Sequence, residues 1–296
     1  MMLRSPAVAG LFYPASAKQC RLQIEQCLAE ARTAGTPPPP GFQATGGIAP
    51  HAGWMFSGAV AGQVVELLAR DPTVETFVVF GAVHRRMGPA AAVYGRGGWN
   101  EPLGDILIDE ELAAACTERS NLIVEDPEAH RAEHSIEVEV PFIQYAAPKA
   151  RLLPIMVPPS PAAPRVGAAV AEAAARLGRQ VRFLGSTDLT HYGPRYGFLP
   201  RGSGAEGLAW ARDVNDRRMI ELMVNLKADE VVVEAARSRN ACGAGAIAAV
   251  IAACRTAGAD RGHLLRHTNS SEVCPGRGGE MEDAVGYAGV VFGRIG

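Results

Sequence analysis

The stretch Thr76-Phe77-Val78-Val79-Phe80-Gly81-Ala82-Val83-His84 is a continuous apolar run that ends in a histidine. Such a run is typical of a strand that is buried on both faces, here over 76–81. Two other apolar runs also lead into a histidine, namely Ile48-Ala49-Pro50-His51 and Phe183-Leu184-Gly185-Ser186-Thr187-Asp188-Leu189-Thr190-His191. If the three strands are parallel, the loops that follow them leave the same edge of one sheet, where open α/β sheets bind ligands. We therefore expect the three histidines to converge.

The rest of the chain alternates between short apolar runs and amphipathic stretches. The pattern predicts further strands at 46–49, 152–157, 181–185, 264–268 and 285–292, and helices at 57–69, 110–118, 133–145, 162–177, about 206–236 and 243–257. Alternation of this kind favours parallel strands with helices packed on both faces. We predict an α/β fold with a largely parallel or mixed central sheet and helices on both faces.

An N-terminal segment precedes the first of these strands. Ser16 followed by Gln19 resembles a capping box at the start of a helix, and residues 37–40 are four consecutive prolines. This proline run comes too early to separate two domains of ordinary size. We interpret residues 1–41 as a helix and a proline-rich connection that pack on the core of a single domain spanning 1–296.

The composition argues against several classes of protein. The net charge is −2, so the chain lacks the basic surface that binds nucleic acid or anionic membranes. Apolar runs stop well short of the ~18 residues of a spanning helix, and the N-terminus lacks the pattern of a signal peptide. The six cysteines form no CxxC pair, which favours a reducing compartment over a disulfide framework. We expect a cytoplasmic protein with no nucleic-acid or membrane partner.

Nucleotide cofactors are not expected either. No lysine follows a glycine, which excludes a Walker A loop, and no serine lies in a GxSxG sequence. The run Gly243-Ala244-Gly245-Ala246-Ile247-Ala248 formally fits the dinucleotide fingerprint. However, no clear strand precedes it, and a cysteine occupies the turn.

That cysteine, Cys242, joins the three histidines by a separate argument. It directly precedes the predicted helix at 243–257, and the positive end of a helix dipole favours a thiolate. A thiolate ligates metals or attacks electrophiles. Taken singly, a loop histidine is usually solvated and a cysteine before a helix is usually a small buried residue. Their shared placement at one predicted sheet edge favours a functional pocket.

The remaining histidines give weaker signals. His130 and His134 are four residues apart, as are His263 and His267. The second pair lies on a predicted strand, where packing is the simpler interpretation. The acids around His134 open a predicted helix, whose dipole they would complement.

Five short motifs occur in the order found in the Memo family, and together they resemble that family over essentially the whole chain. The motifs are Pro50-His51-Ala52-Gly53 with Ser57-Gly58, Gly81-x-x-His84, Glu133-His134-Ser135-x-Glu137 with Pro141-Phe142, Ser186-x-Asp188-x-x-His191-Tyr192-Gly193, and Cys242-Gly243. The opening Ala9-Gly10-Leu11-Phe12-Tyr13-Pro14 is also similar.

The resemblance implies a fold similar to the class III extradiol ring-cleaving dioxygenases, which hold non-haem iron with two histidines and a carboxylate. By this correspondence His51 and His84 would be metal ligands, and His191 the catalytic acid or base. Cys242 stands where those enzymes carry a glutamate ligand. A thiolate there shifts the metal preference toward copper, zinc or differently tuned iron, away from the ligand set of the ring-cleaving enzymes.

The resemblance also implies possible partners. Bacterial relatives are grouped with a radical-SAM protein and an AMMECR-type protein, which suggests a shared pathway.

In the resulting assignment His191 and Asp188 are catalytic, with Asp188 orienting the imidazole of His191. A supporting role, for the site or the substrate, is expected for four further residues: His134, Glu137, Ser186 and Tyr192.

Three hypotheses for function follow. The first is a redox or dioxygenase-like protein whose divalent metal, iron or copper or else zinc, is held by His51, His84 and Cys242. The second is a binding or accessory protein of the radical-SAM-linked pathway that keeps the pocket without turnover. The third is metal-free thiol chemistry, with Cys242 as nucleophile and His191 or His51 as its base.

Overall fold

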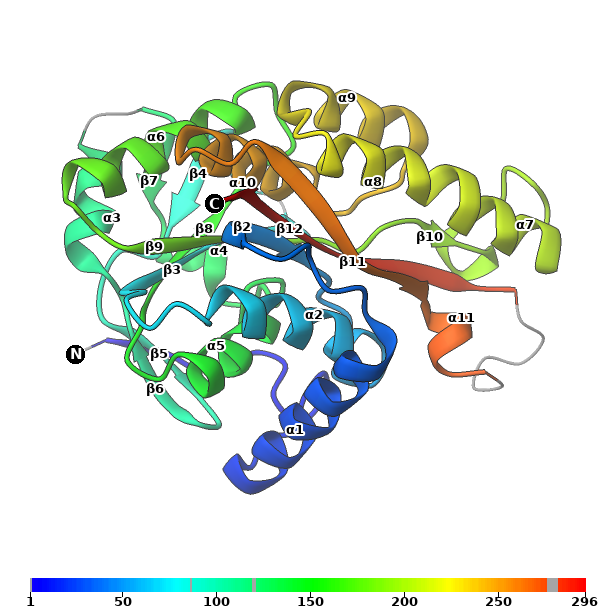
Figure 1. Ribbon diagram of the computed structural model, residues 1–296, viewed down its shortest axis with the longest axis horizontal. Helices are drawn as coiled ribbons and strands as arrows, with labels where there is room; N and C mark the ends of the chain where they lie inside the picture. Colours follow the sequence, from blue (N-terminus) through cyan, green and yellow to red (C-terminus); the bar gives the residue numbers. More distant parts are fainter. Residues whose placement is uncertain (1, 86, 119–120, 276–281) are drawn as a thin grey trace.

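Four parallel strands form the centre of a mixed β-sheet that has helices on both faces (Figure 1). The computed structural model describes residues 2–85, 87–118, 121–275 and 282–296. Within these ranges nine strands pair in the order β10-β12-β2-β9-β3-β8-β4-β7, with β11 also on β12. They are β2 (Phe42–Ala49), β3 (Thr76–Gly81), β4 (Ala91–Val93), β7 (Ile123–Glu125), β8 (Arg151–Met156), β9 (Val181–Ser186), β10 (His191–Tyr192), β11 (Arg261–Asn269) and β12 (Ala284–Ile295).

The direction of the strands decides where the site can form. β2, β9, β3 and β8 are parallel neighbours, so their carboxyl ends share one edge. β12 runs antiparallel to β2, and β4 runs antiparallel to β8. The predicted α/β class with a parallel or mixed sheet is therefore confirmed in its mixed form.

Side chains of the central strands alternate between two cores. On β3, Phe77 and Val79 pack on one face, and Val78 and Phe80 pack on the other, and all four are fully buried. This burial on both faces explains why the strand is apolar at every position. The helices over the two faces are, on one side, α3 (Glu110–Thr117), α6 (Ala163–Arg176), α8 (Arg217–Val224), α9 (Ala228–Ser238) and α10 (Ala244–Thr256), and on the other α1 (Ala17–Ala34), α2 (Trp54–Leu68) and α5 (Val140–Ala146).

The N-terminal segment packs on this core, with α1 against α2. Ser16 caps α1 by accepting a hydrogen bond from the backbone N–H of Gln19, as the capping-box pattern predicted. Asp109 caps α3 in the same way through Leu112. A separate small sheet, β1 (Leu3–Arg4), β5 (Gly98–Glu101) and β6 (Gly104–Leu107), ties the start of the chain to the second face.

Several local predictions were wrong. The helix expected at 133–145 begins only at a 3-10 turn, Glu137–Glu139, because residues 133–136 instead fold around the carboxylate of Glu133. The stretch 206–236 is interrupted at Leu226, whose φ is +55°. It comprises α7 (Ala205–Trp210), a π-helical segment (Ala211–Asp216), α8 and α9. The short elements α4 (Pro127–His130), Pro194–Tyr196 and α11 (Ser270–Val273) were not predicted.

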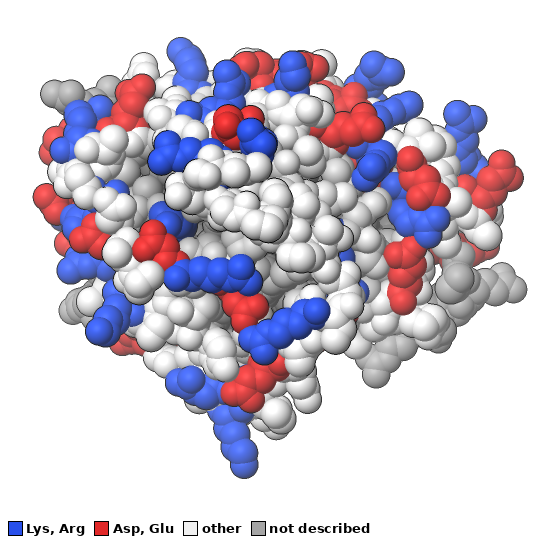
Figure 2. Space-filling view, viewed as in Figure 1, with Lys and Arg blue, Asp and Glu red and all other residues white. Residues whose placement is uncertain are grey.

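The surface agrees with the nearly balanced charge. Figure 2 shows acidic and basic side chains interspersed over the visible face, without a large area of one sign. Among the helices in the described ranges, none combines the length and the apolar character needed to cross a bilayer.

Candidate metal centre

The three histidines predicted to converge follow three adjacent strands. His51 comes two residues after β2, His84 three residues after β3, and His191 begins β10 after the loop that leaves β9. Since β9 lies between β2 and β3 and all three are parallel, their loops leave the same edge of the sheet. The prediction that these residues share the carboxyl edge is confirmed.

A compact group of imidazoles lies at this edge, and it includes a residue expected only to support the site. His51, His84 and His134 each offer a ring nitrogen, and these nitrogens all lie within 4.8 Å of one another. The ring of His134 stacks on that of His84 with centroids 4.7 Å apart, and His51 meets both rings edge-on. His134 is thus a candidate ligand in its own right.

The orientation of His51 follows from its hydrogen bonds. Its Nδ1 lies 2.8 Å from the hydroxyl of Ser186. That hydroxyl donates its only proton to the backbone carbonyl of Ser135 at 2.6 Å, so it accepts from Nδ1–H of His51. The lone pair of His51 is consequently on Nε2, which faces the other donors. The hydroxyl of Ser186 therefore fixes the tautomer of the His51 ring.

His84 is oriented by a residue that the sequence analysis did not select. Glu133 accepts hydrogen bonds from Nδ1 of His84 at 2.9 Å and from the backbone N–H groups of His84, His134 and Ser135. Burial opposes a charge here, but these bonds lower the pKa of Glu133 well below its usual range. A carboxylate on Nδ1 leaves Nε2 of His84 free to bind a metal. The position of Glu133 next to His134 could have indicated this role, but the sequence analysis attributed the acid to the dipole of a predicted helix.

Cys242 lies against this group. Its Sγ is 3.3 Å from Nε2 of His51, and it accepts a hydrogen bond from the backbone N–H of Asp188 at 3.2 Å. Burial raises the pKa of the Cys242 thiol, while contact with His84 lowers it. The expected lowering by the helix N-terminus was therefore wrong in direction, because desolvation of the thiolate dominates.

The charge states of the imidazoles differ with their surroundings. Burial and the neighbouring imidazoles lower the pKa of His51 and His134, which favours neutral rings. Burial also acts to lower the pKa of His84, but hydrogen bonds with Cys242 and Glu133 outweigh this effect and raise the pKa to about 10. A cation bound at this group would take the place of the His84 proton.

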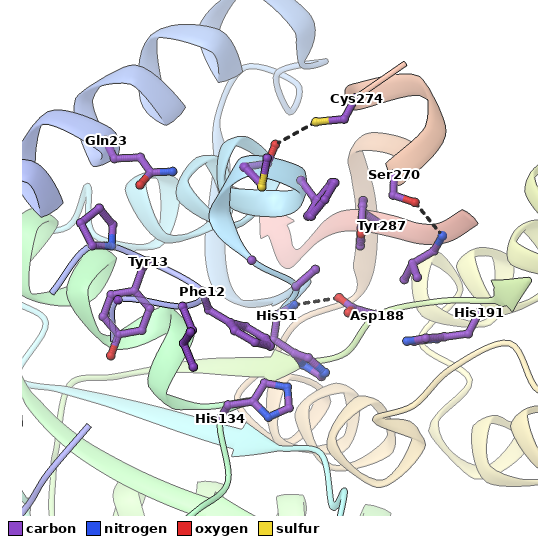
Figure 3. Close-up of a pocket in the computed structure, with 18 of the residues that line it drawn as sticks. Phe12, Tyr13, Gln23, His51, His134, Asp188, His191, Ser270, Cys274 and Tyr287 are labelled. Carbon is purple, nitrogen blue, oxygen red and sulfur yellow. Dashed lines mark hydrogen bonds between the residues drawn. The ribbon is translucent and has the colours of Figure 1, made fainter. Parts of the chain in front are cut away.

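Asp188 and His191 occupy the same loop but make different contacts from those predicted. Oδ1 of Asp188 accepts from the backbone N–H of His51 at 2.8 Å (Figure 3), whereas Nδ1 of His191 lies 3.0 Å from the carbonyl oxygen of Leu189. The expectation that Asp188 orients the His191 ring is corrected, since a backbone carbonyl does so. Burial raises the pKa of Asp188 to about 7 and lowers the pKa of His191.

A pocket of about 1090 Å³ opens onto the histidines. His51, His84, His134 and His191 are among the residues that line it, and Figure 3 shows His191 directed into it from the side opposite His134. Its other lining residues are mixed: apolar and aromatic side chains such as Leu11, Phe12, Met55 and Phe56 lie beside polar ones such as Gln19, Gln23, Arg195 and Asp283. The volume suits a small molecule held beside the imidazoles.

Comparison with known proteins identifies the family. A family model described as Memo-like protein matches residues 4–291. The chain belongs to the Memo-like family. A MEMO1 family protein of Thermococcus kodakarensis is 37% identical over 300 residues, which is 99% of this chain and 100% of the relative. One of Methanopyrus kandleri is 36% identical with the same coverage, and one of Methanothermobacter thermautotrophicus is 38% identical over 97% of this chain and 99% of the relative.

Glu137 and Tyr192, both expected in a supporting role, make their contacts away from the group of histidines. The carboxylate of Glu137 accepts from Arg4 at 2.7 Å and from the backbone N–H groups of Ala7 and Val8, so it anchors the N-terminal segment. Tyr192 is fully buried and donates to the carbonyl of Gly202 at 2.6 Å. Neither lines the pocket, so we assign both to support of its walls.

Glu137 also shares a buried hydrogen-bond network with Tyr13 and a second carboxyl group, that of Glu101. The phenol oxygen of Tyr13 lies 2.6 Å from Glu101 and 2.8 Å from Glu137. A phenol has one proton to donate, so one of the two carboxyl groups must keep its own. Burial and the charge of Glu137 raise the pKa of Glu101 to about 8, which makes Glu101 the protonated partner.

This proton predicts a pH dependence of stability. In the unfolded chain Glu101 loses its proton near its ordinary pKa of 4.5, but in the folded protein it keeps it to about pH 8. Between these values the unfolded state binds fewer protons, so the free energy of unfolding attributable to Glu101 falls as pH rises. Urea denaturation between about pH 5 and about pH 8 should show a smaller fall for Glu101→Gln than for the unmodified protein. An equal decrease of the free energy of unfolding in the two proteins would contradict the assignment of the proton to Glu101.

Proposed function

We propose that this Memo-like protein is a metal-dependent redox or dioxygenase-like protein that acts on a small molecule. The observation that carries the proposal is the group of three imidazoles, from His51, His84 and His134, with ring nitrogens within 4.8 Å of one another. They open directly onto the pocket. A fold akin to the class III extradiol dioxygenases is part of this proposal, and the placement of the histidines at adjacent strand ends supports it.

The donors fit a divalent transition metal. Hydrogen bonds to Nδ1 hold His51 and His84 in the tautomer that leaves Nε2 as the ligand atom, an arrangement common around bound metals. Neutral imidazoles suit iron, copper and zinc, whereas magnesium and calcium prefer oxygen ligands. His134 or the thiolate of Cys242 supplies the third donor. Iron or copper agrees best with a redox role.

The residues around this group would handle substrate and protons. A bound metal would supply a redox-active or Lewis-acidic centre with open positions. His191 donates Nδ1–H to Leu189, so its Nε2 is a proton acceptor at the pocket. Because burial lowers the pKa of His191, the ring is neutral near neutral pH and can take a proton from a bound substrate.

A second candidate is metal-free thiol chemistry. It is favoured by the 3.3 Å contact between Sγ of Cys242 and Nε2 of His51, the arrangement of a nucleophile beside its base. Metal content separates the two candidates, because a thiol enzyme would be active without metal.

The test begins with metal analysis of protein purified without oxygen. We expect close to one equivalent of iron or copper, and oxygen consumption when a catechol or another reductant is added. Bound metal without turnover would instead support the accessory role in a radical-SAM-linked pathway. Protein that neither carries nor takes up metal would refute the metal proposal.

A further inference from the structure

The helical region at the edge of the sheet contains an unusual turn. Between α7 and α8, residues Ala211–Asp216 form a π-helix, a rare geometry that is frequent at functional sites. Because more residues share each turn of a π-helix, successive side chains point in more similar directions. Asn215 and Asp216 are both buried, at 0% and 1% exposure, and both face the interior of the protein.

One set of contacts reaches the loop that carries His191. The carboxylate of Asp216 accepts from the backbone N–H of Thr190 at 2.9 Å. The side-chain amide of Asn215 donates to Oγ1 of the same threonine at 3.1 Å. Thr190 directly precedes His191 and follows the loop residues Asp188 and Leu189. The π-helix thus holds this loop by both its backbone and its side chain.

A second set of contacts reaches the turn before Cys242. The side-chain amide of Asn215 also donates to the carbonyl of Ser238 at 2.9 Å, and the backbone carbonyl of Asn215 accepts from the side-chain amide of Asn240 at 2.9 Å. Between them Arg239 has a φ of +51°, so this turn has an unfavourable backbone conformation that needs outside support. Asn215 is therefore the residue shared by the His191 loop and the Cys242 turn.

Other neighbours hold Asp216 in place. His267 on β11 lies 3.1 Å from its second carboxylate oxygen. The backbone of β12 also passes close by: a Cβ at Gly286 would lie 2.1 Å from the carboxylate, so only glycine fits there. Gly286 in turn exchanges backbone hydrogen bonds with Leu189 and Thr190.

We propose that Asn215 and Asp216 are positioning residues that fix the His191 loop and the Cys242 turn relative to each other. The functional meaning rests on the proposed function, since it assumes that His191 and Cys242 both act at the pocket. The positioning itself is testable in metal-free protein. Failure of metal binding in the unmodified protein would overturn the proposed function and leave the positioning to be judged by its own readouts.

Two readouts report separately on the Cys242 turn and on the His191 loop. The first is the alkylation rate of Cys242 by iodoacetamide, measured by mass spectrometry with Cys274 as an internal reference. The second is the NMR signal of the His191 imidazole, assigned by comparison with His191→Gln. In Asn215→Ala both should change, with Cys242 alkylated about three- to ten-fold faster, the effect expected from losing one or two hydrogen bonds.

Matched variants distinguish positioning from general loss of stability. Asn225→Ala removes an exposed amide at the C-terminal cap of α8 that donates to the backbone carbonyl of Glu221 in the same helix, and should leave both readouts unchanged. Thr190→Val should shift the His191 signal alone, and Asn240→Ala should speed alkylation of Cys242 alone. These two variants keep the test decisive if Asn215→Ala does not fold. The proposal is overturned if folded Asn215→Ala leaves either readout as in the unmodified protein, or if Thr190→Val and Asn240→Ala affect neither.

Discussion

His51→Ala is expected to weaken metal binding at least ~100-fold. Loss of a residue that only hydrogen-bonds to a metal ligand already lowers metal affinity ~10- to 100-fold, and loss of the ligand itself should cost more. His51 belongs to either candidate ligand set. Its ring is within 5.5 Å of the rings of His84 and His134, and its Nε2 lies 3.3 Å from Sγ of Cys242. The measurement is titration of metal-free protein with Fe²⁺ under anaerobic conditions. His263→Ala is the matched control, because His263 lies on β11 and bonds to Thr36.

The same titration tests His134 and Cys242 as further ligands. Cys242→Ser removes the soft donor at nearly constant volume, and His134→Gln removes the third imidazole. We expect affinity to fall about ten-fold or more in each, because both donors adjoin His51. Cys254→Ser is the control for the thiol, since Cys254 is buried inside α10. A variant that keeps the affinity of the unmodified protein identifies a residue that is not a ligand, and unchanged affinity in His51→Ala would refute the site.

The parts of the site that follow strands could be predicted from the sequence. Buried parallel strands are apolar throughout, so a histidine just after such a run marks the edge of the sheet. His51, His84 and His191 were found in this way, and Cys242 was found from the helix that begins after it. In each case a regular element beside the residue fixes its position.

The contribution of Glu133 and His134 could not be predicted in this way. Their segment was expected to be helical, but the carboxylate of Glu133 gathers three backbone N–H groups and the ring of His84, and so replaces a helical turn by a local fold around one side chain. Periodicity carries no information about such a turn. The orientation of His191 by Leu189 escaped for the same reason, because the partner is a backbone carbonyl and leaves no mark on residue type.

Glu137→Gln is expected to lower the free energy of unfolding by about 3–5 kcal/mol, the usual cost of breaking a buried ion pair. The side chain of Glu137 is fully buried, and that of Arg4 is 3% exposed. The substitution keeps the size of the side chain but leaves the guanidinium without its counter-charge. It also places an amide against the backbone N–H groups of Ala7 and Val8, where acceptors are needed.

The measurement is urea denaturation monitored by circular dichroism, with Glu128→Gln as control. Glu128 pairs with Arg131 on the surface, where both side chains are at least 70% exposed, and such pairs contribute about 0–1 kcal/mol. If Glu137→Gln lowers the free energy of unfolding by less than about 1 kcal/mol, the anchoring role is contradicted, because an exposed ion pair contributes as much. The residues that Glu137 anchors lead directly into 10–15, which line the pocket. Glu137→Gln should therefore also make the pocket wall beside His134 less ordered, because Phe12 belongs to this wall and its ring centroid lies 4.9 Å from that of His134.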